Sequence, residues 1–235
     1  MNGHIVDFHS HILPGVDDGA KTVDESLAML DASPRAGVGC MIATPHFYAD
    51  TNTPDHFLKK REAAWENLRA ERQTRLPVVI LGAEVHYFSG IGGADDIRRL
   101  TVDKTNILLL EMPFVTWTDR MLSDITELQE SGMQVVLAHI ERYLAFQKPE
   151  TLKLLLKHRV LIQSNASFFI NRRTRHKALK MLGSGEIHFL GSDAHNMTTR
   201  APNLGEAISC IATHIGEDAV KDLQNRSMRI LLGKS

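Results

Sequence analysis

The sequence has little cysteine, no long apolar run and no excess of charge of either sign. Two cysteines, Cys40 and Cys210, in 235 residues provide no disulfide framework. Lysine and arginine number 27 and aspartate and glutamate 28, so the net charge of −1 gives no basic field for nucleic acid. No apolar run approaches the roughly 18 residues that span a membrane. The first residues also lack the pattern of a secretory signal. We therefore expect a cytoplasmic protein with no nucleic-acid partner and no membrane insertion; the oligomeric state stays open.

The composition is otherwise that of an ordinary globular protein, with 43% hydrophobic and 23% charged residues. A chain of this length buries enough surface to fold without a disulfide or a structural metal. No shift in composition divides it, so we expect a single domain over residues 1–235. Histidine is the exception, because 12 are present.

Seven short apolar segments are predicted to be β-strands, and several are continuous apolar runs, as expected of parallel strands buried on both faces. They are His4–His9, Cys40–Thr44, Val78–Ala83, Ile107–Leu110, Gln134–Ala138, Val160–Gln163 and His188–Gly191. Helical patterns separate most of them: a capping box at Thr22–Glu25, then Pro54–Arg72, Thr118–Glu130, Pro149–Lys157, Arg175–Leu182 and Pro202–Ile215. This alternation predicts an α/β fold with a parallel sheet, either open or closed into a barrel.

Most of the predicted strands run directly into a residue that can bind a metal. These residues are His9, His11, His46, Glu84, Glu111, His139, Asp193 and His195. In α/β barrels the carboxyl ends of the strands converge on the active site. One histidine at a strand end is usually an exposed or hydrogen-bonded residue, but eight such residues in one pattern favour a metal centre.

The spacing of these residues gives some local detail. His9 and His11 are two residues apart, so both point to one face of an extended strand, and Asp7 shares that face as a candidate to orient a ligand imidazole. The loop after this strand adds Asp17 and Asp18, and chemistry alone does not say which of the two is a ligand.

Five short blocks also follow one another in an order that matches a known family. They are His9–Gly19 (HSHILPGVDDG), Ala43-Thr44-Pro45-His46, Gly82-Ala83-Glu84, His139-Ile140-Glu141-Arg142-Tyr143 and Gly191-Ser192-Asp193-Ala194-His195. In these blocks the sequence resembles the PHP (polymerase and histidinol phosphatase) superfamily. It most closely resembles the capsule-type bacterial protein-tyrosine phosphatases, which are manganese-dependent. The resemblance extends over nearly the whole chain.

The resemblance implies a distorted seven-stranded (β/α) barrel with three metal ions. The implied ligand sets are His9, His11, Glu84 and Asp193 for one ion, Glu84, Glu111 and His139 for a second, and Asp18, His46 and His195 for a third. Alignment of the opening motif selects Asp18 rather than Asp17. Arg142 and Arg200 match the family's phosphate-binding arginines. His86 departs from the pattern and is open to several roles: a spare ligand, a general acid, a donor to a ligand or, as we favour, a partly exposed residue at the barrel mouth.

A cluster of this kind suits phosphate ester hydrolysis. Divalent ions held there would supply a hydroxide, and we expect in-line attack of that hydroxide on phosphorus while the arginines bind the non-bridging oxygens. A mixed imidazole and carboxylate shell suits manganese, iron or zinc. The resemblance implies Mn²⁺ and a phosphotyrosyl protein substrate, a bacterial tyrosine kinase tail in capsule or exopolysaccharide synthesis.

Other functions fit the sequence less well. Neither cysteine begins the Cys-x5-Arg motif of thiolate phosphatases, and no P-loop is present. A small-molecule phosphatase such as a histidinol phosphatase is the main alternative, and a non-catalytic binding module is a further one. The basic cluster Arg172, Arg173, Arg175 and Lys177 is interpreted as a solvated helix start, or else as a rim that attracts an acidic peptide.

Overall fold

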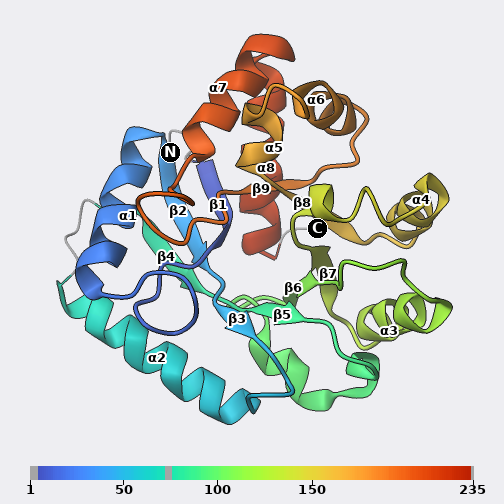
Figure 1. Cartoon of the computed structure of the whole chain (residues 1–235), viewed down its shortest axis with the longest axis horizontal. Coiled ribbons are helices and arrows are strands. Elements are labelled where there is room, and N and C mark those ends of the chain that lie inside the picture. Colours follow the sequence, from blue (N-terminus) through green and yellow to red (C-terminus); the bar gives the residue numbers. More distant parts are fainter. Residues whose placement is uncertain (1–4, 72–75, 234–235) are drawn as a thin grey trace.

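A computed structural model of the chain describes residues 5–71 and 76–233 (Figure 1). Within these residues the strands are β1 (Ile5–Ser10), β2 (Val38–Ala43), β3 (His46–Phe47), β4 (Val78–Leu81), β5 (Glu84–His86), β6 (Ile107–Glu111), β7 (Gln134–Leu137), β8 (Leu161–Asn165) and β9 (Phe189–Gly191). The α-helices are α1 (Val23–Arg35), α2 (Pro54–Glu71), α3 (Asp119–Glu130), α4 (Pro149–Lys157), α5 (Ala166–Ile170), α6 (Arg175–Gly183), α7 (Leu204–His214) and α8 (Glu217–Leu231). Short 3₁₀ helices are η1 (Ile91–Gly93), η2 (Asp95–Leu100) and η3 (Ile140–Arg142).

The strands form two parallel sheets, with the strand orders β1-β2-β4 and β3-β5-β6-β7-β8-β9, which together make a curled wall surrounded by helices (Figure 1). β3 continues β2 after Thr44 and Pro45, and β5 continues β4 after Gly82 and Ala83. The backbone hydrogen bonds run on across these interruptions, from the Gly82 amide to the Ala43 carbonyl and from the Glu84 amide to the Pro45 carbonyl. With each interrupted strand counted once, the described strands correspond to the seven predicted, so the expected α/β barrel is confirmed.

The sheet closes where β9 returns to β1. The two strands meet at one isolated parallel bridge between Ser10 and Ala194, and the Asp193 amide donates to the His9 carbonyl at 2.8 Å. The carboxyl ends of the first and last strands therefore lie side by side.

The helix boundaries follow the sequence signals closely at several places. Thr22 caps α1 by accepting a hydrogen bond from the Glu25 amide, and Thr118 caps α3 in the same way. The Glu25 carboxylate bonds the Lys21 amide rather than the Thr22 amide, so the capping box is displaced by one residue. Prediction missed α5 and α8. The region of Arg72 lies partly outside the described residues, so the predicted end of the second helix there is untested.

The barrel interior has an apolar lower half beneath a polar upper half. The lower half is packed by Val6, Phe8, Ile42, Val102, Ile107, Leu109, Val136, Ala138 and Phe189. The rings of Phe8 and Phe189 stack with their centroids 4.1 Å apart, and Ile230 and Leu231 of α8 pack against this cluster. A larger apolar cluster lies between the sheet and the helices. No helix of the described residues is long and apolar enough to cross a membrane.

Candidate metal centre

Glu84 lies at the centre of the polar half of the barrel. Its buried carboxylate is within 3.3 Å of one ring nitrogen of each of four histidines: His139 at 2.7 Å, His46 at 3.0 Å, His9 at 3.1 Å and His11 at 3.3 Å. Burial alone would raise the pKa of Glu84, but the surrounding histidines hold the pKa well below its usual value. A single carboxylate thus contacts four histidines from three strand ends, those of β1, β2 and β7.

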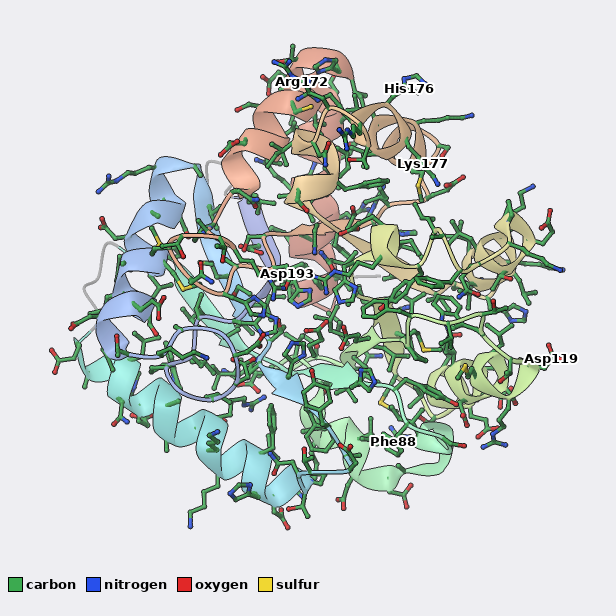
Figure 2. All side chains as sticks on the ribbon, in the orientation of Figure 1. Phe88, Asp119, Arg172, His176, Lys177 and Asp193 are labelled. Atoms are coloured by element: carbon green, nitrogen blue, oxygen red, sulfur yellow. The ribbon has the colours of Figure 1, made fainter. Side chains whose placement is uncertain are left out.

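Three further carboxylates complete the cluster. An oxygen of Glu111 lies 3.4 Å from His139, and an oxygen of Asp18 lies 3.3 Å from His195. Asp193, near the centre of Figure 2, lies 3.6 Å from His9. The structure therefore brings together all nine residues that the sequence and the resemblance name: His9, His11, Asp18, His46, Glu84, Glu111, His139, Asp193 and His195.

Three overlapping groups within this cluster have ligand atoms close enough to hold an ion among the described residues. They are His11, Asp18, His46 and His195; His9, His11 and Glu84; and His46, Glu84 and Glu111. The groups resemble the three expected ligand sets without coinciding with them. Asp193 is outside the groups, and His46 takes the place expected of His139 beside Glu84 and Glu111.

The donor set fits divalent cations. Among the described residues, His46 Nδ1, His139 Nδ1 and His195 Nε2 are buried and have no partner in hydrogen-bonding geometry. The Nε2 atoms of His9 and His11 are only 3.0 Å apart, and both face Glu84. Buried nitrogen lone pairs without donors are costly, whereas ligation of a cation satisfies them.

Asp17 and Asp18 have different positions. The Asp17 carboxylate accepts from His11 Nδ1 at 2.6 Å and from the His46 amide at 2.9 Å, so it orients His11 from outside the cluster. Asp18 is 63% exposed and faces His46 and His195. Gly19 allows the loop to turn tightly here, because an added Cβ would lie 2.2 Å from the His11 carbonyl oxygen.

Gln163 is a member of the site that sequence reasoning missed. Its side-chain oxygen accepts from the His139 amide at 2.7 Å and lies 3.3 Å from His9 Nδ1, while its nitrogen donates to Asn165 Oδ1. Asn165 in turn donates to Asp193 at 2.8 Å. The available signal in the sequence was a polar residue, Gln163, at the end of an otherwise apolar predicted strand. The structure shows that this residue is fully buried.

The expected role of Asp7 is wrong. Asp7 accepts from the backbone amides of Ser192 and His9 and makes no hydrogen bond to the His9 ring. The register of β1 shifts between Asp7 and Ser10, which breaks the simple alternation on which that expectation rested. Gln163 contacts the His9 ring instead.

Two predicted ligands have backbone conformations that are unusual for non-glycine residues. His139 has φ +31° and Asp193 has φ +52°. Each follows the end of a strand, β7 or β9, where the chain turns the side chain into the barrel. Strain of this kind costs about 1–3 kcal/mol and concentrates at functional sites.

The two expected phosphate-binding arginines lie at the mouth of the cluster. Arg142 donates to Asp193 Oδ2, and Arg200 approaches Asp193 Oδ1 at 2.7 Å and Asp18 Oδ2 at 3.9 Å. Both side chains are 36% exposed, so their remaining donors face solvent above the metal-binding residues.

His86 and two aromatic residues form the rest of the mouth. His86 Nδ1 lies 3.0 Å from Glu111 Oε2, and this bond raises the pKa of His86. Tyr48 lies beside His46 and His86, with ring centroids 5.3 and 5.4 Å away. Phe114 lies 6.2 Å from the His139 ring, and Tyr48 and Phe114 are about 40% exposed, at 39% and 42%. The mouth thus presents aromatic side chains next to two of the candidate ligands, His46 and His139.

This protein is a curled parallel α/β barrel with histidines and carboxylates buried at the carboxyl ends of its strands. These features are typical of metal-binding barrel proteins. Comparison with known proteins specifies the family. Residues 5–232 match the family model "Capsular polysaccharide synthesis, CpsB/CapC", and the chain belongs to this family.

Relatives and solved structures agree with this assignment. The chain is 30% identical over 233 residues to the tyrosine-protein phosphatase CpsB of Streptococcus agalactiae, covering 93% of this chain and 94% of that protein. It superposes with a TM-score of 0.85 at 26% identity on a chain from the crystal structures of YwqE from Bacillus subtilis and CpsB from Streptococcus pneumoniae, described as unique metal-dependent tyrosine phosphatases. That match covers 98% of this chain and 96% of the other. A TatD family hydrolase from Entamoeba histolytica shares the fold alone, with a TM-score of 0.61 at 11% identity over 98% of each chain.

Proposed function

We propose that this protein is a metal-dependent tyrosine phosphatase that hydrolyses phosphotyrosine in proteins of capsule or exopolysaccharide synthesis. The observation that carries the proposal is the single cluster of nine metal-binding residues around Glu84, with two arginines at its mouth. Family membership supports it, because relatives of similar length are tyrosine-protein phosphatases.

The nine residues would hold divalent cations, which we propose to be three Mn²⁺ ions. Four carboxylates, on Asp18, Glu84, Glu111 and Asp193, do not neutralise three such ions, so the site keeps a positive balance suited to a phosphate dianion. When bound, the ions supply Lewis acidity and lower the pKa of water. Glu84 has the position of a shared ligand, and Asp17 and Gln163 orient the rings of His11 and His9.

Arg142 and Arg200 hold the phosphate. Both converge on Asp193, so a phosphate at the mouth lies within reach of two guanidinium groups that come from different loops. Charge-assisted, bidentate bonds from arginine fix the orientation of the non-bridging oxygens. Asp193 positions both arginines, with Oδ2 of its carboxylate next to Arg142 and Oδ1 next to Arg200.

The aromatic mouth favours an aryl ester. Tyr48 and Phe114 are exposed beside His46 and His139, where the ring of a phosphotyrosine would pack against them. The tyrosine leaving group has a pKa of about 10, so it departs with less protonation than a serine alkoxide. Packing and leaving-group chemistry therefore both select phosphotyrosine over phosphoserine.

The physiological substrate is, in this proposal, the tyrosine-containing tail of a bacterial tyrosine kinase. The family description connects these proteins with capsular polysaccharide synthesis. A flexible tail also suits a site whose reactive residues lie below the rim of the barrel, because it can insert a single side chain.

Phosphate release in the presence of Mn²⁺ tests the proposal. A phosphotyrosyl peptide, the matching phosphoseryl peptide and histidinol phosphate are compared with and without chelator. We expect chelator-sensitive turnover of the phosphotyrosyl peptide alone, and a drop in its kcat/KM of about tenfold in the double variant Tyr48→Ser, Phe114→Ser. A preference for histidinol phosphate would indicate a small-molecule phosphatase instead. The absence of Mn²⁺-dependent turnover with all three esters would refute the proposal.

A further inference from the structure

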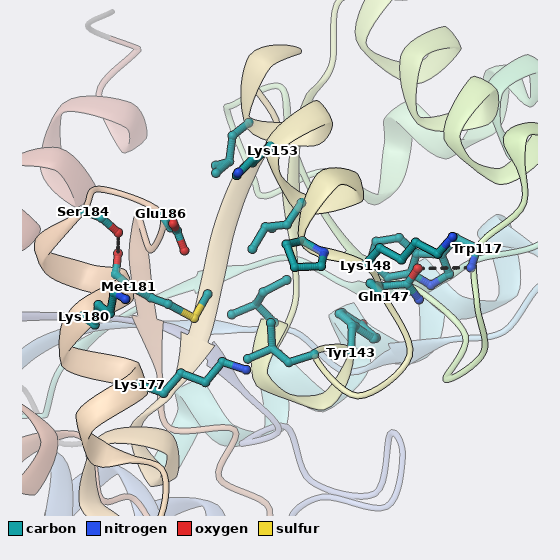
Figure 3. Close-up of a pocket in the computed structure, with 15 residues that line it drawn as sticks. Trp117, Tyr143, Gln147, Lys148, Lys153, Lys177, Lys180, Met181, Ser184 and Glu186 are labelled. Carbon is teal, nitrogen blue, oxygen red and sulfur yellow. Dashed lines mark hydrogen bonds between the residues drawn. The ribbon is translucent and has the colours of Figure 1, made fainter.

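A groove lies between helices α4 and α6, beside the metal centre but outside it (Figure 3). It encloses about 300 Å³. Apolar side chains form its floor: Ile140, Leu144, Leu152, Leu156 and Met181. Nothing in the proposed reaction uses this groove.

Four lysines surround the apolar floor. Lys148 is the N-cap of α4 and Lys153 lies in the middle of that helix, while Lys177 and Lys180 come from α6. All four are exposed, and none forms an ion pair with a carboxylate of the described residues. Glu186 is the one acidic residue among the described residues that line the groove, so the groove is strongly positive on a chain of net charge −1. Lys177 extends across the groove toward Tyr143 in Figure 3.

The groove adjoins the mouth of the metal centre through one wall. Tyr143 lines the groove, and its ring lies 5.6 Å from the ring of His139 and 5.7 Å from that of Phe114. Trp117 packs on Tyr143 in the same wall, and its amide donates to the side chain of Gln147. The buried ring of Tyr143 therefore separates the groove from Phe114 and His139 by a single side chain.

The basic cluster Arg172, Arg173, Arg175 and Lys177, before and within α6, contributes only one residue to the lining of the groove. The Arg175 guanidinium donates to the carbonyls of Phe169 and Ile170, so it caps α5 rather than facing a ligand. Arg172 and Lys177 are on the periphery of the molecule in Figure 2, and Lys177 alone of the cluster lines the groove.

We propose that the α4–α6 groove binds an acidic segment of the substrate polypeptide, with bulky apolar side chains on the floor and carboxylates on the four lysines. This inference rests on the proposed function, since it takes the phosphotyrosine and the acidic segment to belong to one chain. The recessed, apolar floor favours a polypeptide over an anionic lipid surface, which would need a protruding face. Binding here raises the affinity for peptides and leaves the chemistry at the metal centre unchanged.

Two phosphotyrosyl peptides and one small ester test the groove. One peptide carries glutamates and leucines beside the phosphotyrosine, the second has glutamine in place of every glutamate, and the ester is 4-nitrophenyl phosphate. We expect KM for the acidic peptide to be about tenfold lower than for its neutral partner, with the difference shrinking as salt increases. In the double variant Lys153→Glu, Lys177→Glu this difference disappears, while kcat and turnover of 4-nitrophenyl phosphate stay unchanged.

A matched control separates the groove from net charge. Lys59→Glu, Lys157→Glu makes the same charge change at exposed lysines outside the groove, one of them on α4 itself. We expect this control to keep the preference for the acidic peptide. Equal effects of the two double variants, or a groove variant that keeps the preference, would overturn the proposal.

A binding measurement that needs no catalysis separates the test of the groove from the test of the proposed function. The unphosphorylated acidic peptide, labelled with a fluorophore, is titrated with wild-type protein and the groove variant. Weaker binding by the groove variant supports the groove even where no ester is hydrolysed. Binding to phosphatidylglycerol vesicles that depends on the lysines, with no difference for peptides, would assign the groove to lipid instead.

Discussion

The two halves of the barrel interior are built on the same strands and are stabilised in opposite ways. Below, Phe8 and Phe189 stack within an apolar cluster that needs only close packing. Above, Glu84 and its four histidines need charge pairing and hydrogen bonds at every atom. The lower half therefore determines how stable the fold is, and the upper half determines what it binds. Substitutions in one half should leave the property of the other nearly unchanged.

The largest effect on stability is expected in the lower half. Phe189→Ala removes a fully buried ring that stacks on Phe8, and loss of such a ring costs about 3–5 kcal/mol. Chemical denaturation measures this loss, with the exposed Phe146→Ala as control, expected within about 0.5 kcal/mol. The folded variant should still bind the metal content of the wild type. A loss of metal equal to the loss of stability would show that the halves are not separable.

The largest effect on activity is expected at Glu84. Glu84→Gln removes a charge shared by four histidines, and we expect kcat to fall by about 10²–10³-fold, together with a loss of bound metal. Elemental analysis and phosphate release measure the two quantities. Glu66→Gln on the exposed face of α2 is the control and should behave as wild type. Full metal content in Glu84→Gln would contradict the central position of this carboxylate.

A smaller effect, on metal affinity, is expected at Gln163, which lies where the two halves of the barrel interior meet. Gln163→Met keeps the size of the side chain but removes the acceptor that the His139 amide and the His9 ring face. We expect Mn²⁺ affinity to fall by about 10–100-fold, the usual range for groups that orient a ligand. Isothermal titration measures the Mn²⁺ affinity. The control is Gln134→Met, at the start of the neighbouring strand β7 and away from the candidate ligands. Unchanged affinity in Gln163→Met would reduce Gln163 to a packing role.

The smallest effect concerns pH and lies away from the metal centre. Burial, with the nearby charge of Arg226, lowers the pKa of His188 to about 4. The unfolded chain protonates this histidine near pH 6.5, whereas the folded chain does not, so falling pH favours unfolding. Between pH 7 and 5.5 we expect wild type to lose about 1 kcal/mol of stability relative to His188→Gln. A difference that does not change with pH would mean that His188 keeps its ordinary pKa.

Sequence patterns predicted the strands well because buried parallel strands are continuous apolar runs, as in Ile107–Leu110. Most of the candidate ligands could be named from the sequence because they follow those runs. Asp7 was misplaced because a register shift in β1 is invisible in the residue pattern. Gln163 and the groove were missed because their roles depend on contacts between elements far apart in the chain. α8 was missed because its buried apolar residues, Val220 and Leu223, are few among charged ones.

The seam between β9 and β1 has a consequence for how the protein reaches its native state. The Ser192 amide donates to the Asp7 carboxylate across a sequence separation of 185 residues, and two backbone hydrogen bonds accompany it, from the Asp193 amide to the His9 carbonyl and from the His11 amide to the Ala194 carbonyl. Closing a loop of that length lowers the entropy of the chain before stabilising contacts form. The seam should therefore form late in folding. His9 and His11 lie on one side of the seam and Asp193 and His195 on the other. Ions held by both sides would tether the two ends of the chain, so metal supply would govern how long the completed barrel stays closed.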